Sequence, residues 1–134
     1  MSETMTPGQA LPEITMRPSA LQLFRYSAVT WNSHRIHYDL DWAKQEGHAG
    51  LVVHSHLHAA NAIRALTEGI GPGWRVDKVA YRIVRSAVAG DVLTASAQLE
   101  TASEDGNVLE FSLHEINQHG EACLEGIATV SRRP

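Results

Sequence analysis

The stretch NVLEFSLHEINQHGEACLEGIATVSR, residues 107–132, contains two runs in which apolar and polar residues alternate. A period of two is typical of β-strands, because successive side chains of a strand point to opposite faces of the sheet. The tripeptide QHG separates the runs, and short segments that contain glycine favour antiparallel turns. The stretch therefore predicts two neighbouring antiparallel strands. The residues that share the predicted apolar face are Leu109, Phe111 and Leu113 in the first strand and Leu124, Gly126, Ala128 and Val130 in the second.

Two earlier runs have the same pattern. KVAYRIVRS (78–86) and DVLTASAQLETAS (91–103) also alternate, and the segments AVAG and EDG separate the runs. In the second of these runs, the residues that share one face are Leu93, Ala95, Ala97 and Leu99. Four consecutive strands joined by tight connections predict an antiparallel meander. Because one face of this meander is apolar, a second layer must cover it.

The predicted cover is a helix in SHLHAANAIRALTEGIGPG, residues 55–73. Its apolar residues follow helical spacing and are Ala59, Ala62, Ile63, Leu66 and Ile70. His54 or Ser55 stands at the capping position, and Gly71-Pro72-Gly73 ends the helix. The sequence thus predicts the α+β class, with an antiparallel sheet wrapped around a long central helix. One covered face leaves the other face and an edge of the sheet open, so we expect a homodimer or a larger homo-oligomer.

Length and composition limit the function classes. A chain of 134 residues predicts a single domain, and a net charge of −4 argues against a nucleic-acid partner. Cys123 is the only cysteine, and neither a signal peptide nor an apolar run of membrane-spanning length is evident, so we expect a cytoplasmic protein with no membrane partner. Residues 1–19 carry three of the five prolines and are predicted to be an arm or a lead-in strand before a domain at 20–134.

Two segments rich in histidine hold most of the functional information. TWNSHRIHYDLDWA (30–43) contains His34 and His37, and LVVHSHLHAANAIRAL (51–66) contains three alternating histidines. Two-residue steps on a helix rotate a side chain by about 200°, so His56 is expected to point away from His54 and His58. We therefore predict no metal site, and interpret His56 and His58 as polar residues at the start of the helix.

The segment FRYSAVTWNSHRIHYDLDWAKQEGHAGLVVHSHLHAA (24–60) resembles the MaoC-like (R)-specific enoyl-CoA hydratases. Within that superfamily it is most similar to type-2 3-hydroxyacyl-thioester dehydratases and to mesaconyl- or itaconyl-CoA hydratases, which carry a similar N-x-H-R-I-H-Y-D…GLVVHG stretch. The resemblance continues through YRIVRSAVAGDVLTASAQLE (81–100). It implies the hot-dog fold, dimers as the smallest common unit, and reversible hydration of a 2-enoyl thioester to a 3-hydroxyacyl thioester.

The resemblance also implies roles for individual residues. His37 matches the catalytic base, and Asn32 stands at a position where the broad family has an aspartate. Ser55, after His54, stands where a glycine usually supplies a backbone N–H for the oxyanion. Such chemistry needs a base with a pKa near neutrality and donors aimed at the developing charge, which histidine and a helix N-terminus supply.

The remaining candidates concern the substrate. Arg35 could pair with a second carboxylate on the acyl group, and His34 and His54 lie in the same motifs. Arg82 and Arg85 are candidates for phosphate contacts. Coenzyme A or an acyl carrier would be part of the substrate, and we predict no separate cofactor. Two alternatives stay open: a non-catalytic acyl-binding subunit, favoured by Ser55 and by the absence of the family's prolines at 56 and 86, and a hot-dog thioesterase, which would normally need a carboxylate base.

Overall fold

The computed structural model describes residues 5–134; the first four residues of the predicted arm lie outside the described residues. Its elements, in chain order, are β1 (Ile14–Met16), α1 (Ala20–Thr30), a 3₁₀ turn η1 (Arg35–His37), α2 (Leu40–Gln45), α3 (Ser55–Ile70), β2 (Trp74–Ile83), β3 (Leu93–Ala102), β4 (Val108–Ile116) and β5 (Ala122–Arg132). The five strands form one antiparallel sheet in the order β1-β3-β4-β5-β2. This confirms the predicted α+β architecture.

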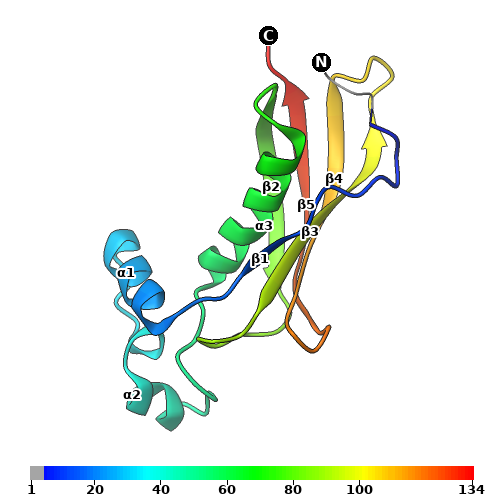
Figure 1. Cartoon of the computed structure of the whole chain (residues 1–134). Coiled ribbons are helices and arrows are strands. Elements are labelled where there is room, and N and C mark those ends of the chain that lie inside the picture. Colours follow the sequence, from blue (N-terminus) through cyan, green and yellow to red (C-terminus); the bar gives the residue numbers. More distant parts are fainter. Residues whose placement is uncertain (1–4) are drawn as a thin grey trace.

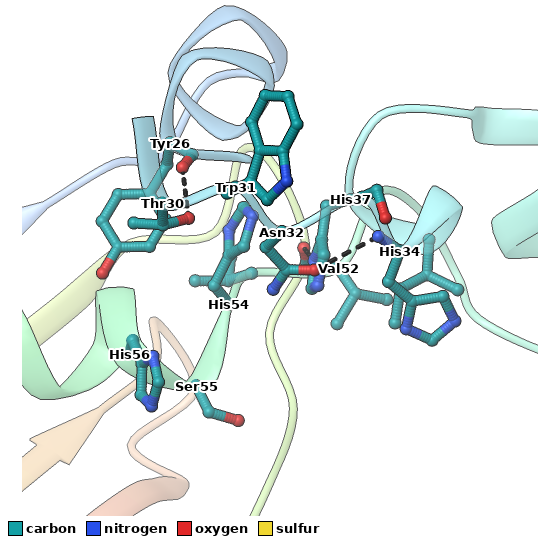
Figure 2. A pocket seen from close by; sticks show the side chains of 13 residues that line it. Tyr26, Thr30, Trp31, Asn32, His34, His37, Val52, His54, Ser55 and His56 are labelled. Atoms are coloured by element: carbon teal, nitrogen blue, oxygen red, sulfur yellow. Dashed lines mark hydrogen bonds between the residues drawn. The ribbon is translucent and has the colours of Figure 1, made fainter. Parts of the chain in front are cut away.

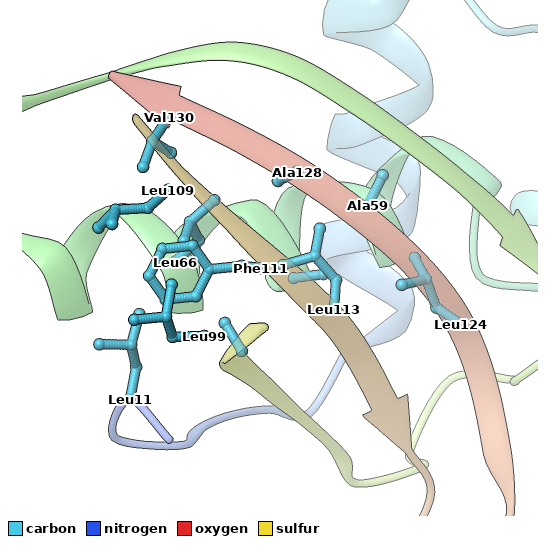
Figure 3. Packing of buried hydrophobic residues seen from close by; sticks show 12 residues of the cluster. Leu11, Ala59, Leu66, Leu99, Leu109, Phe111, Leu113, Leu124, Ala128 and Val130 are labelled. Atoms are coloured by element: carbon cyan, nitrogen blue, oxygen red, sulfur yellow. The ribbon is translucent and has the colours of Figure 1, made fainter. Parts of the chain in front are cut away.

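The core lies between α3 and the inner face of the sheet (Figure 3). Phe111 is fully buried at its centre, where Leu66 of α3 and Leu99 of β3 belong to the same cluster. All the strand residues predicted to face the core are buried apart from Gly126, which is partly exposed. On α3 the predicted face is buried at Ala59, Ala62 and Leu66, whereas Ile63 and Ile70 are only partly buried. The alternation and the helical spacing thus indicated the packed faces correctly.

The prediction of a four-strand meander was wrong in one respect. β3, β4 and β5 are consecutive neighbours, but β2 pairs with β5 at the far edge rather than with β3. The strand predicted to start at Lys78 is β2, and it begins four residues earlier, at Trp74. The segment AVAG (87–90) therefore crosses between the two sides of the sheet instead of forming a tight turn. Local alternation reports which face a residue occupies, but not which strand lies beside it.

The crossing segment forms part of the frame of the candidate site. Val53 N–H donates to the Ala87 carbonyl at 2.9 Å, and Ala89 N–H donates to the Leu51 carbonyl at 2.8 Å. These bonds hold the residues just before α3 in an extended conformation. The chain that precedes the helix is therefore tied to the crossing segment at Leu51 and at Val53.

Two short helices, which the sequence did not predict, extend beyond the N-terminal end of α3 (Figure 1). α1 begins after Ser19, whose side chain accepts a hydrogen bond from Gln22 N–H at 3.1 Å, as an N-cap residue does. Leu23 of α1 is fully buried and joins a second apolar cluster with Val53 and Leu57 at the start of α3. This second cluster holds α1 against the N-terminal end of α3.

The residues before α1 also belong to the folded body. β1 pairs with β3, and Leu11 lies in the main core beside α3. Of the two alternatives predicted for residues 1–19, this part of the segment has the character of a lead-in strand. No described helix is long and apolar enough to cross a membrane.

Candidate active site

A cavity of about 730 Å³ opens where α1, η1 and the N-terminus of α3 meet (Figure 2). The residues that line it are Tyr26, Thr30, Trp31, Asn32, Ser33, His34, Ile36, His37, Val52, Val53, His54, Ser55 and His56. Four of these side chains are imidazoles, and none is a carboxylate, a lysine or an arginine. The chemistry available at this wall is therefore that of histidine, amide and hydroxyl groups and of backbone N–H groups.

His37 is held in one tautomer. Its ring is buried, and Nδ1 lies 2.7 Å from the Val52 carbonyl oxygen. A carbonyl only accepts, so Nδ1 must carry the proton, and in the neutral ring Nε2 keeps its lone pair. Burial lowers the pKa of His37, as do His34 and His48, against the opposing effect of the Val52 carbonyl. At neutral pH the ring is thus an uncharged base.

The backbone around His37 is fixed by the same neighbour. Val52 N–H donates to the Ile36 carbonyl at 2.9 Å, so Val52 binds both the main chain and the ring of the 3₁₀ turn. Val52 itself lies in the segment that pairs with the crossing connection. The position of the candidate base is therefore determined by contacts with segments distant in sequence.

The ring of His54 packs against one face of the His37 ring. The two rings are stacked with centroids 3.7 Å apart and planes 16° apart, and the edge of Tyr26 packs on His54 at 4.8 Å. His54 Nε2 forms a 2.8 Å hydrogen bond with the Ser27 hydroxyl of α1. Burial, followed by the nearby His37 and His56, lowers the pKa of His54 to about 4, so this ring is neutral at physiological pH. With only 2% of its surface exposed, His54 serves mainly as packing support.

Asn32 follows an unusual helix end. α1 stops at Trp31, whose φ of 56° is left-handed, and Asn32 N–H donates to the Ser27 carbonyl at 2.9 Å. The side-chain oxygen of Asn32 accepts from His34 N–H at 3.2 Å, as in an Asx turn. The amide oxygen is thus engaged by the backbone, and the amide nitrogen is the group left for a ligand in the cavity.

Ser55 is the first residue of α3 and borders the cavity. The N-cap residue, His54, makes no side-chain capping bond, and the first N–H groups of a helix have no intrahelical acceptor. The N–H of Ser55 therefore remains available to an acceptor at the positive end of the helix dipole.

The predicted site residues fall into two groups. The first group lines the cavity and consists of Asn32, His34, His37, His54 and Ser55. His34 also lies 3.5 Å from a carboxylate oxygen of Glu46. The three arginines lie elsewhere: Arg35 pairs with Asp39 at 2.7 Å and lies over the Trp42 ring, Arg82 pairs with Glu125 on the outer face, and Arg85 pairs with Glu121.

Sequence reasoning missed several residues of this region. Ser27, Tyr26 and Thr30 come from a helix that was not predicted, although the Ser19 cap after Pro18 was a usable signal. The interpretation of His58 as a polar residue at the helix start was wrong, because its side chain is fully buried and pairs with Glu115 of β4. Helical spacing places His58 one turn after His54 on the same face, which could have indicated burial.

Part of the sequence is similar to a known hydratase, and the fold is similar to that of solved structures. Over 46 residues, 34% of this chain, the sequence is 54% identical to mesaconyl-C(4)-CoA hydratase of Chloroflexus aurantiacus. That stretch covers only 16% of the relative's length. The fold is that of the (R)-hydratase from A. caviae involved in PHA biosynthesis, with a TM-score of 0.91, 20% identity, and 98% and 99% of the two chains covered.

A second solved structure with the same fold belongs to a two-protein assembly, the ChsH1-ChsH2 complex from Mycobacterium tuberculosis. Its TM-score is 0.86 at 19% identity, with 96% of this chain and 98% of that chain covered. At these identities, both structural likenesses establish the hot-dog fold. The family assignment comes from sequence: the model of the hydroxyacyl-thioester dehydratase type 2 family matches residues 2–89, which include β1, the cavity and α3. The chain is a member of the hydroxyacyl-thioester dehydratase type 2 family.

Proposed function

We propose that this chain catalyses the reversible addition of water to a 2-enoyl thioester, which gives a 3-hydroxyacyl thioester. The observation that carries the proposal is the tautomer of His37. Its Nδ1–H is bound to the Val52 carbonyl, and Nε2 is left as a neutral base on a cavity that also borders a helix N-terminus. A general base and an oxyanion donor on one cavity are what this addition requires.

In the proposed mechanism, Nε2 of His37 takes a proton from water as the water oxygen bonds to C3 of the enoyl group. The C2–C3 π electrons move toward the thioester, and the Ser55 N–H stabilises the resulting enolate oxygen with the help of the helix dipole. The imidazolium of His37 then returns a proton to C2. The amide nitrogen of Asn32 donates a hydrogen bond to the water oxygen and orients the water. Because an amide cannot exchange a proton at this pH, His37 both takes the proton and returns one. One water is consumed, and His37 regains its starting state.

The likeness to a mesaconyl-C(4)-CoA hydratase supports a short acyl group with a second carboxylate as the substrate. Arg35 was the predicted partner of that carboxylate, but its guanidinium is bound to Asp39. Among the residues that line the cavity, His34 and His56 are the side chains suited to meet such a group. The carrier in this proposal is coenzyme A or an acyl carrier protein, bound as part of the substrate.

One experiment separates this proposal from its two rivals. The purified protein is mixed with mesaconyl-CoA or crotonyl-CoA, and enoyl absorbance and free thiol are followed together. Hydration removes the absorbance without releasing thiol, whereas a thioesterase releases thiol. Absence of both changes, with a measurable acyl-CoA affinity, would instead indicate a non-catalytic acyl-binding subunit and would overturn the proposed activity.

A further inference from the structure

Beneath the cavity, the first two turns of α3 carry a second group of buried polar side chains. His58 and Asn61 lie on the same face of the helix, and both contact Glu115 of β4. His58 Nδ1 bonds to one carboxylate oxygen, and Asn61 Nδ2 donates to the other at 2.8 Å. Asn61 Nδ2 also lies 3.4 Å from the Leu93 carbonyl of β3. We call these three side chains, His58, Asn61 and Glu115, the anchor cluster.

Burial of the anchor cluster carries a large desolvation cost. His58 and Glu115 are 0% exposed and Asn61 is 4% exposed, so a carboxylate and its partners are fully removed from water. Within the described residues, His58 Nε2 and Asn61 Oδ1 find no hydrogen-bond partner. Apolar side chains of similar volume are often as stable as a buried ion pair or more so. Stability alone therefore does not account for these residues.

The alternative is that the cluster specifies position. Farther along α3, the contacts with the sheet come from alanine and leucine side chains, and such apolar contacts are not directional. The directed bonds of the anchor cluster are satisfied only in one placement of the helix. His58 and Asn61 are three and six residues after Ser55, a distance of about 5 to 9 Å at the rise of an α-helix.

We propose that the anchor cluster positions the N-terminus of α3, and with it the Ser55 N–H, relative to His37. This inference rests on the proposed function. His37 is bound to Val52, and the segment around Val52 is itself bonded to the crossing connection through Val53 and Leu51. We therefore expect loss of the cluster to move the oxyanion donor more than the base. A displacement of about 1 Å in such a site can lower the rate by about 10²-fold.

The test replaces the cluster with apolar side chains of similar volume: His58→Leu, Asn61→Val and Glu115→Leu together. We expect a protein that is at least as stable to heat as the wild type, with kcat lowered at least about 10-fold, KM within about 3-fold and an unchanged acid limb of the pH profile. Leu66→Val, on the same helix but outside the cluster, is the matched control and should lower stability without lowering kcat.

Glu115→Gln guards against failure of the triple variant to fold. The glutamine oxygen can accept from Asn61 Nδ2–H, and its amide nitrogen can donate to His58 Nδ1 when the His58 proton is on Nε2. It should retain more than about a third of wild-type kcat, whereas Glu115→Leu alone should not. A folded triple variant with wild-type kcat would overturn the inference, as would an inactive Glu115→Gln protein that is as stable as the wild type.

A measurement without substrate keeps this inference separate from the proposed activity. The Ser55 amide signal in the ¹⁵N NMR spectrum should shift in the triple variant and stay near its wild-type position in Glu115→Gln and Leu66→Val. If the wild type hydrates no enoyl thioester, the proposed function is wrong. The positioning role is then tested by the Ser55 amide signal alone. An unmoved Ser55 signal in the triple variant refutes that role whatever the activity.

Discussion

At the scale of single residues, the site depends on where one proton resides. The carbonyl of Val52 holds the proton of His37 on Nδ1, and burial together with His34 and His48 keeps the pKa of the ring below its usual value. The neighbouring His54 is neutral because its pKa is lowered to about 4. The stacked pair thus presents a neutral base on a neutral support.

Removal of the base is the most direct test at this scale. His37→Ala should lower kcat by roughly 10² to 10⁴, the usual contribution of a general acid–base group. Steady-state kinetics with an enoyl-CoA substrate gives the value, and circular dichroism confirms that the variant is folded. His119 is exposed and does not line the cavity, so His119→Ala should leave kcat unchanged. A folded His37→Ala protein with near-normal rates would transfer the role of base to another residue, with His34 the first to examine.

A charge at position 32 should change the pH dependence. In Asn32→Asp, the new carboxylate stabilises the protonated form of His37 and raises its pKa. The rate falls as the pH drops through the pKa of His37, because the base is then occupied by a proton. The acid limb of kcat against pH should therefore move to higher pH in Asn32→Asp.

The matched control for this variant is Asn107→Asp, which adds the same charge in the β3–β4 turn and should leave the limb in place. If the limb does not move in Asn32→Asp, His37 is not the group that titrates. Asn32→Ala should lower kcat as well, while leaving the fold intact, since it removes the donor that orients the water.

At the scale of elements, β2 leaves no room for a side chain at one position of β5. Gly126 of β5 lies opposite Tyr81 of β2, and a Cβ built at Gly126 would lie 2.6 Å from the Ala80 carbonyl oxygen. The contact with backbone cannot be relieved by rotating a side chain. The glycine in the run EACLEGIATV is therefore required by strand packing and not by a turn.

Gly126→Ala should accordingly destabilise the protein by about 1 to 3 kcal/mol, the usual range for overpacking a well-packed position. Gly73→Ala is the control, because a Cβ there meets nothing within 4 Å and the backbone is not left-handed. Urea denaturation of both variants measures the difference. Equal stability of Gly126→Ala and the wild type would mean that β2 can move away from β5 at no cost.

At the scale of the whole molecule, β2 is an unpaired edge of the sheet. It is ten residues long, and the opposite edge is covered in part by the N-terminal segment. Long open edges are sites for pairing with another strand. We propose that β2 and the uncovered surface beside it join a second copy of this chain, as expected from the one-sided cover in the sequence.

Sedimentation equilibrium tests this assembly. The species at micromolar concentration should have at least twice the monomer mass of 14.7 kDa. Asp77→Asn, a change on β2 that keeps the shape of the side chain, serves as a control for effects of charge and should preserve the assembly. A stable monomer at these concentrations would refute the proposal.

The sequence by itself determined the elements with regular periods. Alternation located the packed faces of β3, β4 and β5, and helical spacing with the Gly-Pro-Gly stop located α3, because these patterns are local and repeat along the chain. The resemblance carried by the segment 24–60 indicated the cavity residues His37, Asn32 and Ser55, which the fold brings to one wall. Family membership for this segment was likewise evident from the sequence and is confirmed.

Only the tertiary structure decided the rest, because those features depend on contacts between residues distant in sequence. The position of β2 beside β5 and the proton on Nδ1 of His37 follow from such contacts. The pairing of His58 with Glu115, 57 residues later, has no local signal, although helical spacing indicated that His58 could be buried. A residue type indicates which bonds a side chain can make, and the fold determines which partner is within reach.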